Sequence, residues 1–259
     1  MSGNHALQWS PAVIVDDLSN VLAPRAAARI VSDVCVGLAY TAVRLDNGRC
    51  GLAYTFHEDA GEGCSVVKEA GTLAGRPAGE LAGWVKTLDA TSVALGVATL
   101  NALAEPPASA TETDFTELIR VAPGDVVGMV GYFAPLVAPL RQRAARLHIF
   151  ERRPREQGDE HPDWTAPLLL PECDVVIISG TAVINRTIDA LLTHIPKARE
   201  VAVLGPSTPL VPEVFAGRGV TLLGGVQVTD AARVLRVVSE GGGTRRFGGA
   251  VRKLCVRLR

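Results

Sequence analysis

Residues 125–151 read DVVGMVGYFAPLVAPLRQRAARLHIFE. This stretch opens with an apolar run at residues 126–130 and closes with another at residues 147–151. The residues between the two runs have a helical composition from 135 to 146, and Pro135 suits the first turn of a helix. A strand, a helix and a second strand in this order form the unit from which parallel sheets are built. The stretch therefore predicts an α/β domain.

The same alternation continues toward the C-terminus. Further strands are predicted at residues 174–179, 200–204 and 220–223, and helices at residues 183–192, 211–215 and 229–240. Apolar strands separated by helices are typical of a parallel sheet that is covered on both faces. In the last residues, 254–259, leucine and valine alternate with cysteine and arginine, which favours a charged edge strand. We expect a Rossmann-like parallel-sheet domain over residues 109–259.

The first 108 residues predict a smaller α+β domain. Residues 34–45 and 49–56 are rich in strand-forming side chains, and Asp46-Asn47-Gly48 between them suits the tight turn of a β-hairpin. Helices are expected over residues 80–88 and 91–104, and two prolines end the second helix. Before the hairpin, apolar side chains recur at helical spacing and Pro24 interrupts them, so two short helices are expected there.

Composition places the chain among ordinary globular proteins. Hydrophobic residues make up 47% and charged residues 20%, and a net charge of -1 lacks the basic field that non-specific nucleic-acid binding requires. The first residues do not form a secretory signal, and the apolar runs are too short to insert into a membrane. The odd cysteine count, 5, without a C-x-x-C pair argues against a disulfide framework and a thiolate zinc site. We expect a cytoplasmic protein with reduced thiols, assembled as a homodimer because that symmetry is common.

Glycines and an acid follow the first two strands of the parallel sheet. The turn Gly131-Tyr132-Phe133 precedes a helix, whose N-terminal N–H groups attract an anion. Glu151 ends the next strand about 20 residues later, where an acid binds a ribose hydroxyl in dinucleotide-binding folds. The glycines do not complete the G-x-G-x-x-G fingerprint, so a plain strand-to-helix connection explains the turn equally well. For Glu151 the alternative is an exposed glutamate that pairs with the arginines at positions 152, 153 and 155.

Polar loops follow two further strands. Gly180-Thr181, with Asn185 just inside the next helix, leaves space and donors at the sheet edge, although Thr181 also suits a helix N-cap. The loop Gly205-Pro206-Ser207-Thr208 is stiffened by proline and has two hydroxyl groups, so it suits either a ligand or a rigid connection. Open α/β sheets bind ligands at the carboxyl ends of their strands. We therefore expect these loops and Glu151 to share one ligand site.

Other polar clusters give weaker signals. His57-Glu58-Asp59, with Glu62 and Cys64, offers nitrogen, oxygen and sulfur donors to a metal, but a solvated acidic loop is the favoured interpretation. The same holds for His161 in its charged loop, whereas His148 inside a strand is expected to be packed or paired. The sequence has no G-x-S-x-G elbow, Walker A loop or H-E-x-x-H motif.

Several motifs together resemble one known family. In order along the chain, they are Leu95-Gly96-Val97-Ala98-Thr99-Leu100-Asn101-Ala102, Gly128-Met129-Val130-Gly131-Tyr132-Phe133, Glu151 with Pro154, Leu170-Pro171-Glu172-Cys173-Asp174, Gly180-Thr181 with Asn185 and Thr187, and Gly205-Pro206-Ser207-Thr208-Pro209-Leu210 with Pro212 and Phe215. Their spacing resembles the family known as putative heavy-metal chelation, formerly a domain of unknown function. The resemblance implies an enolase N-terminal-like domain packed on a Rossmann-like domain, with a site in the cleft between them.

The resemblance also implies which side chains line that cleft. Carried over motif by motif, they are Asn101, Tyr132, Glu151, Thr181, Asn185, Ser207 and Thr208. Histidine occurs in relatives at the position of Tyr132, and tyrosine, with a pKa near 10, is a poorer metal ligand at neutral pH. Glu151 is therefore the best candidate for a metal ligand.

Two functions follow as hypotheses. The first is binding of a transition or heavy metal, or of a small metal chelate or anionic ligand, in the interdomain cleft. The motifs contain few His or Cys residues, so a bound organic chelator would have to supply further metal ligands. The second is a small-molecule enzyme that uses a nucleotide-like cofactor at the strand ends, with Glu151 as the one obvious general base. Both place a small molecule or a metal complex in the site.

Overall fold

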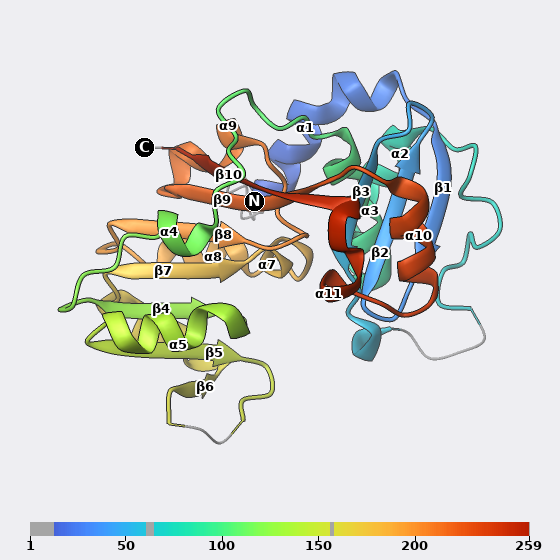
Figure 1. The fold of residues 1–259 in the computed structure, drawn as a ribbon. Coiled ribbons are helices and arrows are strands. Elements are labelled where there is room, and N and C mark those ends of the chain that lie inside the picture. The colour runs from blue at the N-terminus through green and yellow to red at the C-terminus, as the bar shows by residue number, and fades with distance from the viewer. Residues whose placement is uncertain (1–12, 61–64, 156–157, 259) are drawn as a thin grey trace, which may run out of the picture.

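The computed structural model describes residues 13–60, 65–155 and 158–258. These residues form two β-sheets covered by helices, one sheet of three strands and one of seven (Figure 1). The chain therefore has the expected α/β fold, in which a small antiparallel sheet precedes a large, mostly parallel sheet. No helix in the described ranges is long and apolar enough to cross a membrane.

The small sheet has the order β1-β2-β3, with β1 (Val31–Val36), β2 (Tyr40–Leu45) and β3 (Cys50–Tyr54) all antiparallel to their neighbours. The predicted hairpin is confirmed, and Gly48 supplies the positive φ of 84° that its turn requires. The predicted first strand of that hairpin, residues 34–45, is in fact two strands. The chain turns between them at Gly37, where a Cβ atom would lie only 2.2 Å from the Val238 carbonyl oxygen.

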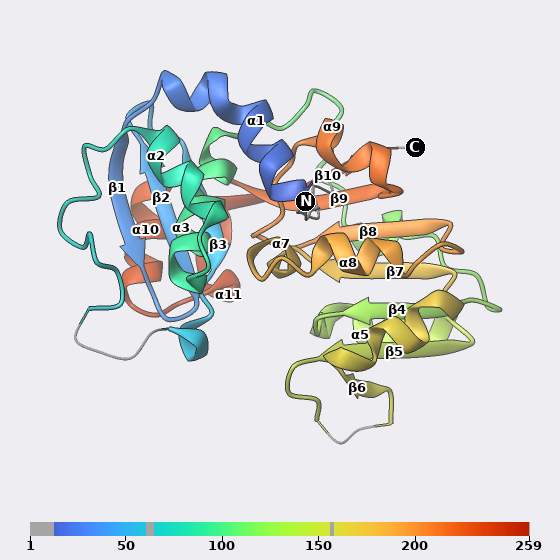
Figure 2. The ribbon, with the colours of Figure 1, turned by 180° about the vertical axis from the view of Figure 1, so that it is seen from behind.

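Helices cover both faces of the small sheet. On one face lie α1 (Ile14–Ala27), α2 (Ala78–Gly83) and α3 (Ala90–Leu103) (Figure 2). Two 3-10 turns belong to the same half: η1 (His57–Asp59) follows β3 and η2 (Trp84–Lys86) follows α2. The prediction of two short helices before the sheet is wrong, because α1 continues through Pro24. The hydrogen bond that proline cannot make would reach Asn20, whose residue is exposed to water, so the helix loses little there.

The large sheet has the order β10-β9-β8-β7-β4-β5-β6. Its strands are β4 (Val126–Val130), β5 (Arg146–Glu151), β6 (Glu160–Pro162), β7 (Val175–Ser179), β8 (Glu200–Leu204), β9 (Leu222–Val228) and β10 (Val251–Arg257). All neighbours are parallel except β10, which is antiparallel to β9 and forms the predicted edge strand. The opposite edge strand, β6, was not predicted, because three residues are too few to show a strand pattern.

Short helices precede and connect the strands of the large sheet. They are α4 (Phe115–Leu118), α5 (Ala134–Arg143), η3 (Asp163–Thr165), α6 (Ala166–Leu169), η4 (Leu170–Glu172), α7 (Thr181–Ile184), α8 (Ile188–Thr193), α9 (Pro212–Phe215), η5 (Ala216–Arg218), α10 (Ala231–Ser239), α11 (Thr244–Phe247) and η6 (Gly248–Ala250). The single helix predicted over residues 183–192 is wrong. Asn185 ends α7, because its side-chain oxygen accepts hydrogen bonds from Thr187, and Arg186 has a helix-breaking φ of 60°.

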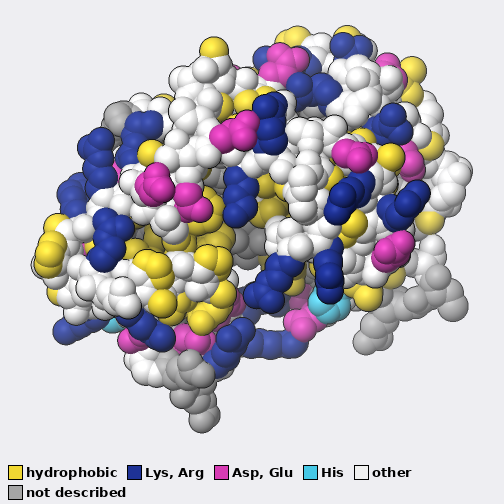
Figure 3. Space-filling view, viewed as in Figure 1, with side chains coloured by type: hydrophobic (Ala, Val, Ile, Leu, Met, Phe, Trp, Pro, Cys, Tyr) yellow, Lys and Arg dark blue, Asp and Glu magenta, His cyan; other side chains and the backbone are white. Residues whose placement is uncertain are grey.

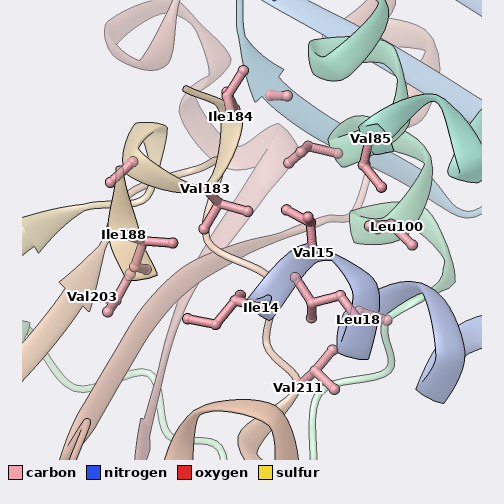
Figure 4. Packing of buried hydrophobic residues seen from close by; sticks show 14 of the residues in the cluster. Ile14, Val15, Leu18, Val85, Leu100, Val183, Ile184, Ile188, Val203 and Val211 are labelled. Atoms are coloured by element: carbon pink, nitrogen blue, oxygen red, sulfur yellow. The ribbon is translucent and has the colours of Figure 1, made fainter. Parts of the chain in front are cut away.

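The two sheets are joined by a continuous core. Ile14 and Val15, at the start of α1, pack between the small sheet's helices and Val183 and Ile188 of α7 and α8 (Figure 4). The backbone N–H of Ile14 also donates to Asp189 Oδ1 over 3.0 Å. In the other direction, α10 leaves the large sheet and packs on β1 and β2 (Figure 1). Each half therefore packs a helix against the other half: α1 against α7 and α8, and α10 against β1 and β2.

Candidate functional site

The carboxyl ends of the parallel strands face the small sheet. Strands β4 and β7 lie side by side at the centre, and the chain proceeds outward in opposite directions from them. In α/β proteins such a reversal of strand order leaves a crevice at the carboxyl ends of the strands, where ligands bind. Figure 3 shows the surface hollowed between the two halves, with basic, acidic and histidine side chains gathered along the lower side of the hollow. We refer to this hollow as the cleft.

Glu151 is the carboxylate that the sequence placed at this edge. Its residue is half-buried, and its Oε1 atom accepts a hydrogen bond of 2.5 Å from the backbone N–H of Tyr132. Burial raises the pKa of Glu151, the N–H groups of Tyr132 and Arg152 oppose that rise, and nearby Glu160 adds to it. A half-buried carboxylate with a raised pKa is incompletely compensated by the protein.

Glycines bring the strand ends close together. Gly131 has a φ of +91°, and a Cβ atom there would lie 2.8 Å from the Cβ atom of Ser179. A Cβ atom at Gly180 would lie 2.4 Å from Thr208 Oγ1. These turns can therefore form only where the side chain is a hydrogen atom, which explains the strand-end glycines without any ligand.

One side of the cleft is closed by polar contacts between the halves, which we call the joint. Ser207 Oγ, in the loop after β8, accepts a hydrogen bond of 2.8 Å from the backbone N–H of Tyr54 on β3. Asn101 Nδ2, on α3, donates to the carbonyl oxygens of Leu52 at 2.7 Å and of Pro206 at 3.5 Å. Asn101 and Ser207 therefore dock the two halves, a role that their positions in the sequence do not reveal.

Of the remaining predicted site residues, two lie beside Glu151 or Gly205 and two make only local hydrogen bonds. Tyr132 and Phe133 are half-buried beside Glu151 and Gly205. Thr181 Oγ1 is engaged locally, donating to Ser179 Oγ over 2.8 Å. Asn185 lies in the exposed turn after α7, where its oxygen accepts from the Thr187 N–H and hydroxyl.

The other side of the cleft has a charged margin, which we call the rim. Arg152 makes two hydrogen bonds with Asp59, at 2.6 and 2.9 Å, and its guanidinium group lies 5.7 Å from the centre of the Phe56 ring. Arg153 pairs with Glu58 over 2.6 Å. The acidic loop that was a weak metal candidate thus forms ion pairs with the two arginines that follow β5. Its two other candidate donors, Glu62 and Cys64, lie outside the described residues.

Two tyrosines lie near Glu151, Tyr132 and Tyr54, and the sequence predicted only Tyr132 as a site residue. The guanidinium group of Arg155 lies 4.7 Å from the centre of the Tyr132 ring. Tyr54 packs edge-on against Phe56, with 5.1 Å between ring centres. Burial, followed by the charges of Glu58 and Glu151, raises the pKa of the Tyr54 phenol. Tyr54 is nearly 100 residues from Glu151 in the chain, so no local motif could have linked them.

Few side chains in the described chain are arranged to hold a metal directly. Residues 13–60, 65–155 and 158–258 contain no group of three or more His, Cys, Asp or Glu placed to bind one ion. Burial raises the pKa of both Cys50 and Cys173 to about 12, so these thiols stay protonated. His148 is paired with His161, as its position inside a strand predicted. The donor set does not fit a soft metal ion bound by protein ligands alone.

Two cavities lie near the joint. A pocket of about 50 Å³, with room for a few water molecules, touches Asn101 and Thr208 of the site and Arg49 and Gln227 beyond it. A more open depression of about 530 Å³ lies between α9, β10 and the residues after α3, and it contains none of the predicted site residues. Glu151 lines neither of them.

Comparisons with known proteins agree with the motif-based resemblance. Two family models, both described as putative heavy-metal chelation, match residues 114–257 and residues 19–104. An uncharacterised protein of Methanocaldococcus jannaschii is 29% identical over 178 residues, which are 66% of this chain and 68% of that protein.

Two solved structures share the fold. A crystal structure of a protein of unknown function from Pyrococcus horikoshii, of the family that matches residues 114–257, is 25% identical, with a TM-score of 0.83 over 94% of this chain and 99% of that chain. A second protein of unknown function of that family, from Desulfitobacterium hafniense, is 24% identical, with a TM-score of 0.75 over 93% of this chain and 98% of that chain.

Proposed function

The chain belongs to the family described as putative heavy-metal chelation, and from that membership we propose that it binds a small metal complex in the cleft between its two sheets. One observation supports the proposal above the others. Glu151 is a half-buried carboxylate at a strand end, and burial raises its pKa. A metal centre coordinated by Glu151 would stabilise its charged form, which the protein alone leaves incompletely compensated.

A complex suits the cleft better than a bare ion. Transition metals bind four to six donor atoms and favour imidazole or thiolate nitrogen and sulfur. The described chain offers no cluster of three such side chains, and its buried thiols are protonated. An organic chelator would supply most of the donors and leave one coordination position for Glu151.

The surroundings of Glu151 suit the organic part of such a complex. Chelators of metals are rich in carboxylates, which guanidinium groups bind strongly. The guanidinium group of Arg155 lies over the ring of Tyr132, and the backbone N–H of Tyr132 donates a hydrogen bond to Glu151. Phe133 and Tyr54 add ring surface for the carbon skeleton of the ligand. Glu151 and Arg155 would thus bind opposite charges of one ligand.

A second function is an enzyme with a nucleotide-like cofactor. The glycine turn at Gly131 and the acid at the end of β5 favour it, because they stand where dinucleotide-binding folds place their phosphate turn and ribose acid. Thermal shift with NAD, S-adenosylmethionine and ATP tests this alternative. A ligand present at 100 times its dissociation constant should stabilise the protein by about 2.7 kcal/mol.

Calorimetric titration tests the first function. The probes are Ni²⁺ alone and Ni²⁺ with one equivalent of nitrilotriacetate, added to the wild type, to Glu151→Gln and to the matched control Glu240→Gln, whose residue is exposed at the end of α10. We expect the chelate to bind more tightly than the ion, and Glu151→Gln to weaken chelate binding about tenfold or more, as loss of one charged contact does. Equal binding by both variants would exclude Glu151, and a wild type that binds neither probe would contradict metal-complex binding.

A further inference from the structure

Two histidines that the proposed site does not use face each other across neighbouring strands. His148 Nδ1, on β5, lies 3.0 Å from His161 Nε2, on β6, and the ring centres are 5.1 Å apart. His148 is only 7% exposed, and its second nitrogen, Nε2, is buried without a hydrogen-bond partner. Because side chains alternate along a strand, His148 lies on the opposite face of the sheet from Glu151.

The unpartnered nitrogen determines the tautomers of the neutral pair. A neutral imidazole has one donor nitrogen and one acceptor nitrogen. If His148 bears its proton on Nδ1, it donates to His161 Nε2 and leaves only a bare acceptor buried at Nε2. The other arrangement would bury an N–H group without an acceptor, which native structures rarely contain. The favoured neutral pair therefore has His148 as the donor.

Any added proton disturbs this arrangement. If His161 takes it up, His161 Nε2 becomes a donor, so His148 must accept at Nδ1 and hold its own proton at Nε2. If His148 takes it up, both of its nitrogens bear protons. In either case a buried N–H group at His148 Nε2 has no acceptor, and a second proton would set two cationic rings and two donors against each other.

Other charges around the pair do not remove this penalty. Burial is the main cause that lowers the pKa of His148, and the charges of His161 and Arg146 lower it further. Glu172 on η4 and Asp159 before β6 oppose them, but Asp159 is already paired with Arg141 over 2.5 Å. The neighbouring position on β4 is a glycine, Gly128, which offers no side-chain acceptor.

We propose that the hydrogen bond between His148 and His161 helps to hold edge strand β6 on β5 at neutral pH, and that mild acid breaks this hydrogen bond and releases β6. Strand β6 is short, with three residue pairs to β5, so side-chain contacts such as the histidine pair and the Arg141–Asp159 ion pair contribute to its attachment. Release would also affect the surroundings of Glu151, because Glu151 pairs with Pro162 of β6 and Glu160 of β6 accepts from the Arg155 N–H. The pH response of the histidine pair does not depend on what the cleft binds.

Nuclear magnetic resonance of ¹⁵N-histidine protein tests the tautomer directly. At pH 7.5 we expect His148 to bear its proton on Nδ1 and to share that proton with His161 through a hydrogen bond. A His148 protonated on Nε2 at this pH would overturn the proposal, since acid would then bring no new buried donor. This measurement needs only the wild-type chain and stands even if a variant fails to fold.

Hydrogen exchange followed by mass spectrometry tests the release. Protection of peptides spanning residues 146–165 should fall about fivefold or more between pH 7.5 and pH 5, the factor for one unsatisfied buried donor. Protection of β8, at residues 200–204 in the centre of the sheet, should stay constant after correction for intrinsic exchange rates. Equal pH dependence in both regions, or none in residues 146–165, would contradict the proposal.

The variant His161→Gln separates titration from packing. Glutamine keeps an acceptor for His148 but does not titrate, and burial lowers the pKa of the remaining His148, so the fall in protection between pH 7.5 and pH 5 should be smaller than in the wild type. His194→Gln, at the end of α8, removes a histidine outside the pair and should leave the fall unchanged. The proposal fails if His161→Gln retains the wild-type pH response.

Discussion

The joint and the rim connect the same two halves of the molecule by different means. At the joint, Ser207 is only 2% exposed, and both its hydroxyl group and the Asn101 amide contact backbone groups of the other half. At the rim, the side chain of Arg152 is 51% exposed and that of its partner Asp59 is 38% exposed. Both sides bring polar groups together, but only the joint removes them from water.

Because of this difference in burial, the contacts of the joint should stabilise the docking of the halves more than those of the rim do. An exposed ion pair contributes about 0–1 kcal/mol, whereas leaving a buried polar group without its partner costs about 1–3 kcal/mol. The joint therefore fixes how the halves sit, and a ligand can displace rim contacts at small cost. Glu151 lies on the rim side, where burial raises its pKa and the protein leaves its charge incompletely compensated.

The largest expected effect is beside the joint, from Gly180→Ala, because Gly180 packs on the loop that carries Ser207. The new Cβ atom would lie 2.4 Å from Thr208 Oγ1 and 2.7 Å from the Thr208 backbone nitrogen, so the loop after β8 must move. We expect a loss of about 3 kcal/mol or more in the free energy of unfolding, measured by chemical denaturation.

Gly83→Ala is the matched control for that substitution. Gly83 is the last residue of α2, and a Cβ atom there has nothing within 4 Å, so this variant should be neutral or up to about 1 kcal/mol more stable. Equal denaturation midpoints for the two variants would show that the joint is not tightly packed.

A smaller effect is expected from Asn101→Ala, compared with Asn185→Ala. Both asparagines were predicted to line the site, but Asn101 bridges the halves from a half-buried position and Asn185 stands in an exposed turn. The loss should be about 1–3 kcal/mol for Asn101→Ala and about 0.5–1 kcal/mol for Asn185→Ala, whose hydrogen bonds to Thr187 are exposed to water. Thermal denaturation of both variants measures this difference, and a larger loss for Asn185→Ala would reverse our assignment of the joint.

The sequence predicted the strands and the strand-end loops because those signals are local. The apolar runs at β4, β5, β7 and β8 were predicted within one residue, since a buried parallel strand must be apolar along its length. The break between α7 and α8 was missed, although Asn185 and Arg186 produce it. Its cause is one side-chain hydrogen bond, which hydrophobic periodicity does not detect.

What the sequence missed depends on contacts between distant residues. Arg152 and Asp59 are 93 positions apart, and Asn101 and Pro206 are 105 apart. Both arginine pairing and the docking role of Asn101 arise only after the two sheets have met. Strand-end position therefore predicted the loops that follow β4, β5, β7 and β8, but not which of their residues the fold uses for its own cohesion.

The smallest expected effect is at the rim, from Glu151→Gln, and it should change sign relative to the joint variants. The folded protein raises the pKa of Glu151 above its ordinary value of 4.5, so in the window above 4.5 the folded state holds more proton than the unfolded state. Stability therefore falls as pH rises through that window, and the charged form costs stability at pH 7. Glutamine keeps the acceptor for the Tyr132 N–H and removes the charge.

We accordingly expect Glu151→Gln to be equal to or slightly more stable than the wild type at pH 7, by less than about 1 kcal/mol. Below pH 4.5 the wild-type carboxyl group is protonated too, so the two proteins should converge there. Urea denaturation at pH 4 and pH 7 checks both statements. A variant that is clearly less stable at pH 7 would make Glu151 part of the joint, and the reason for assigning it to a ligand would be lost.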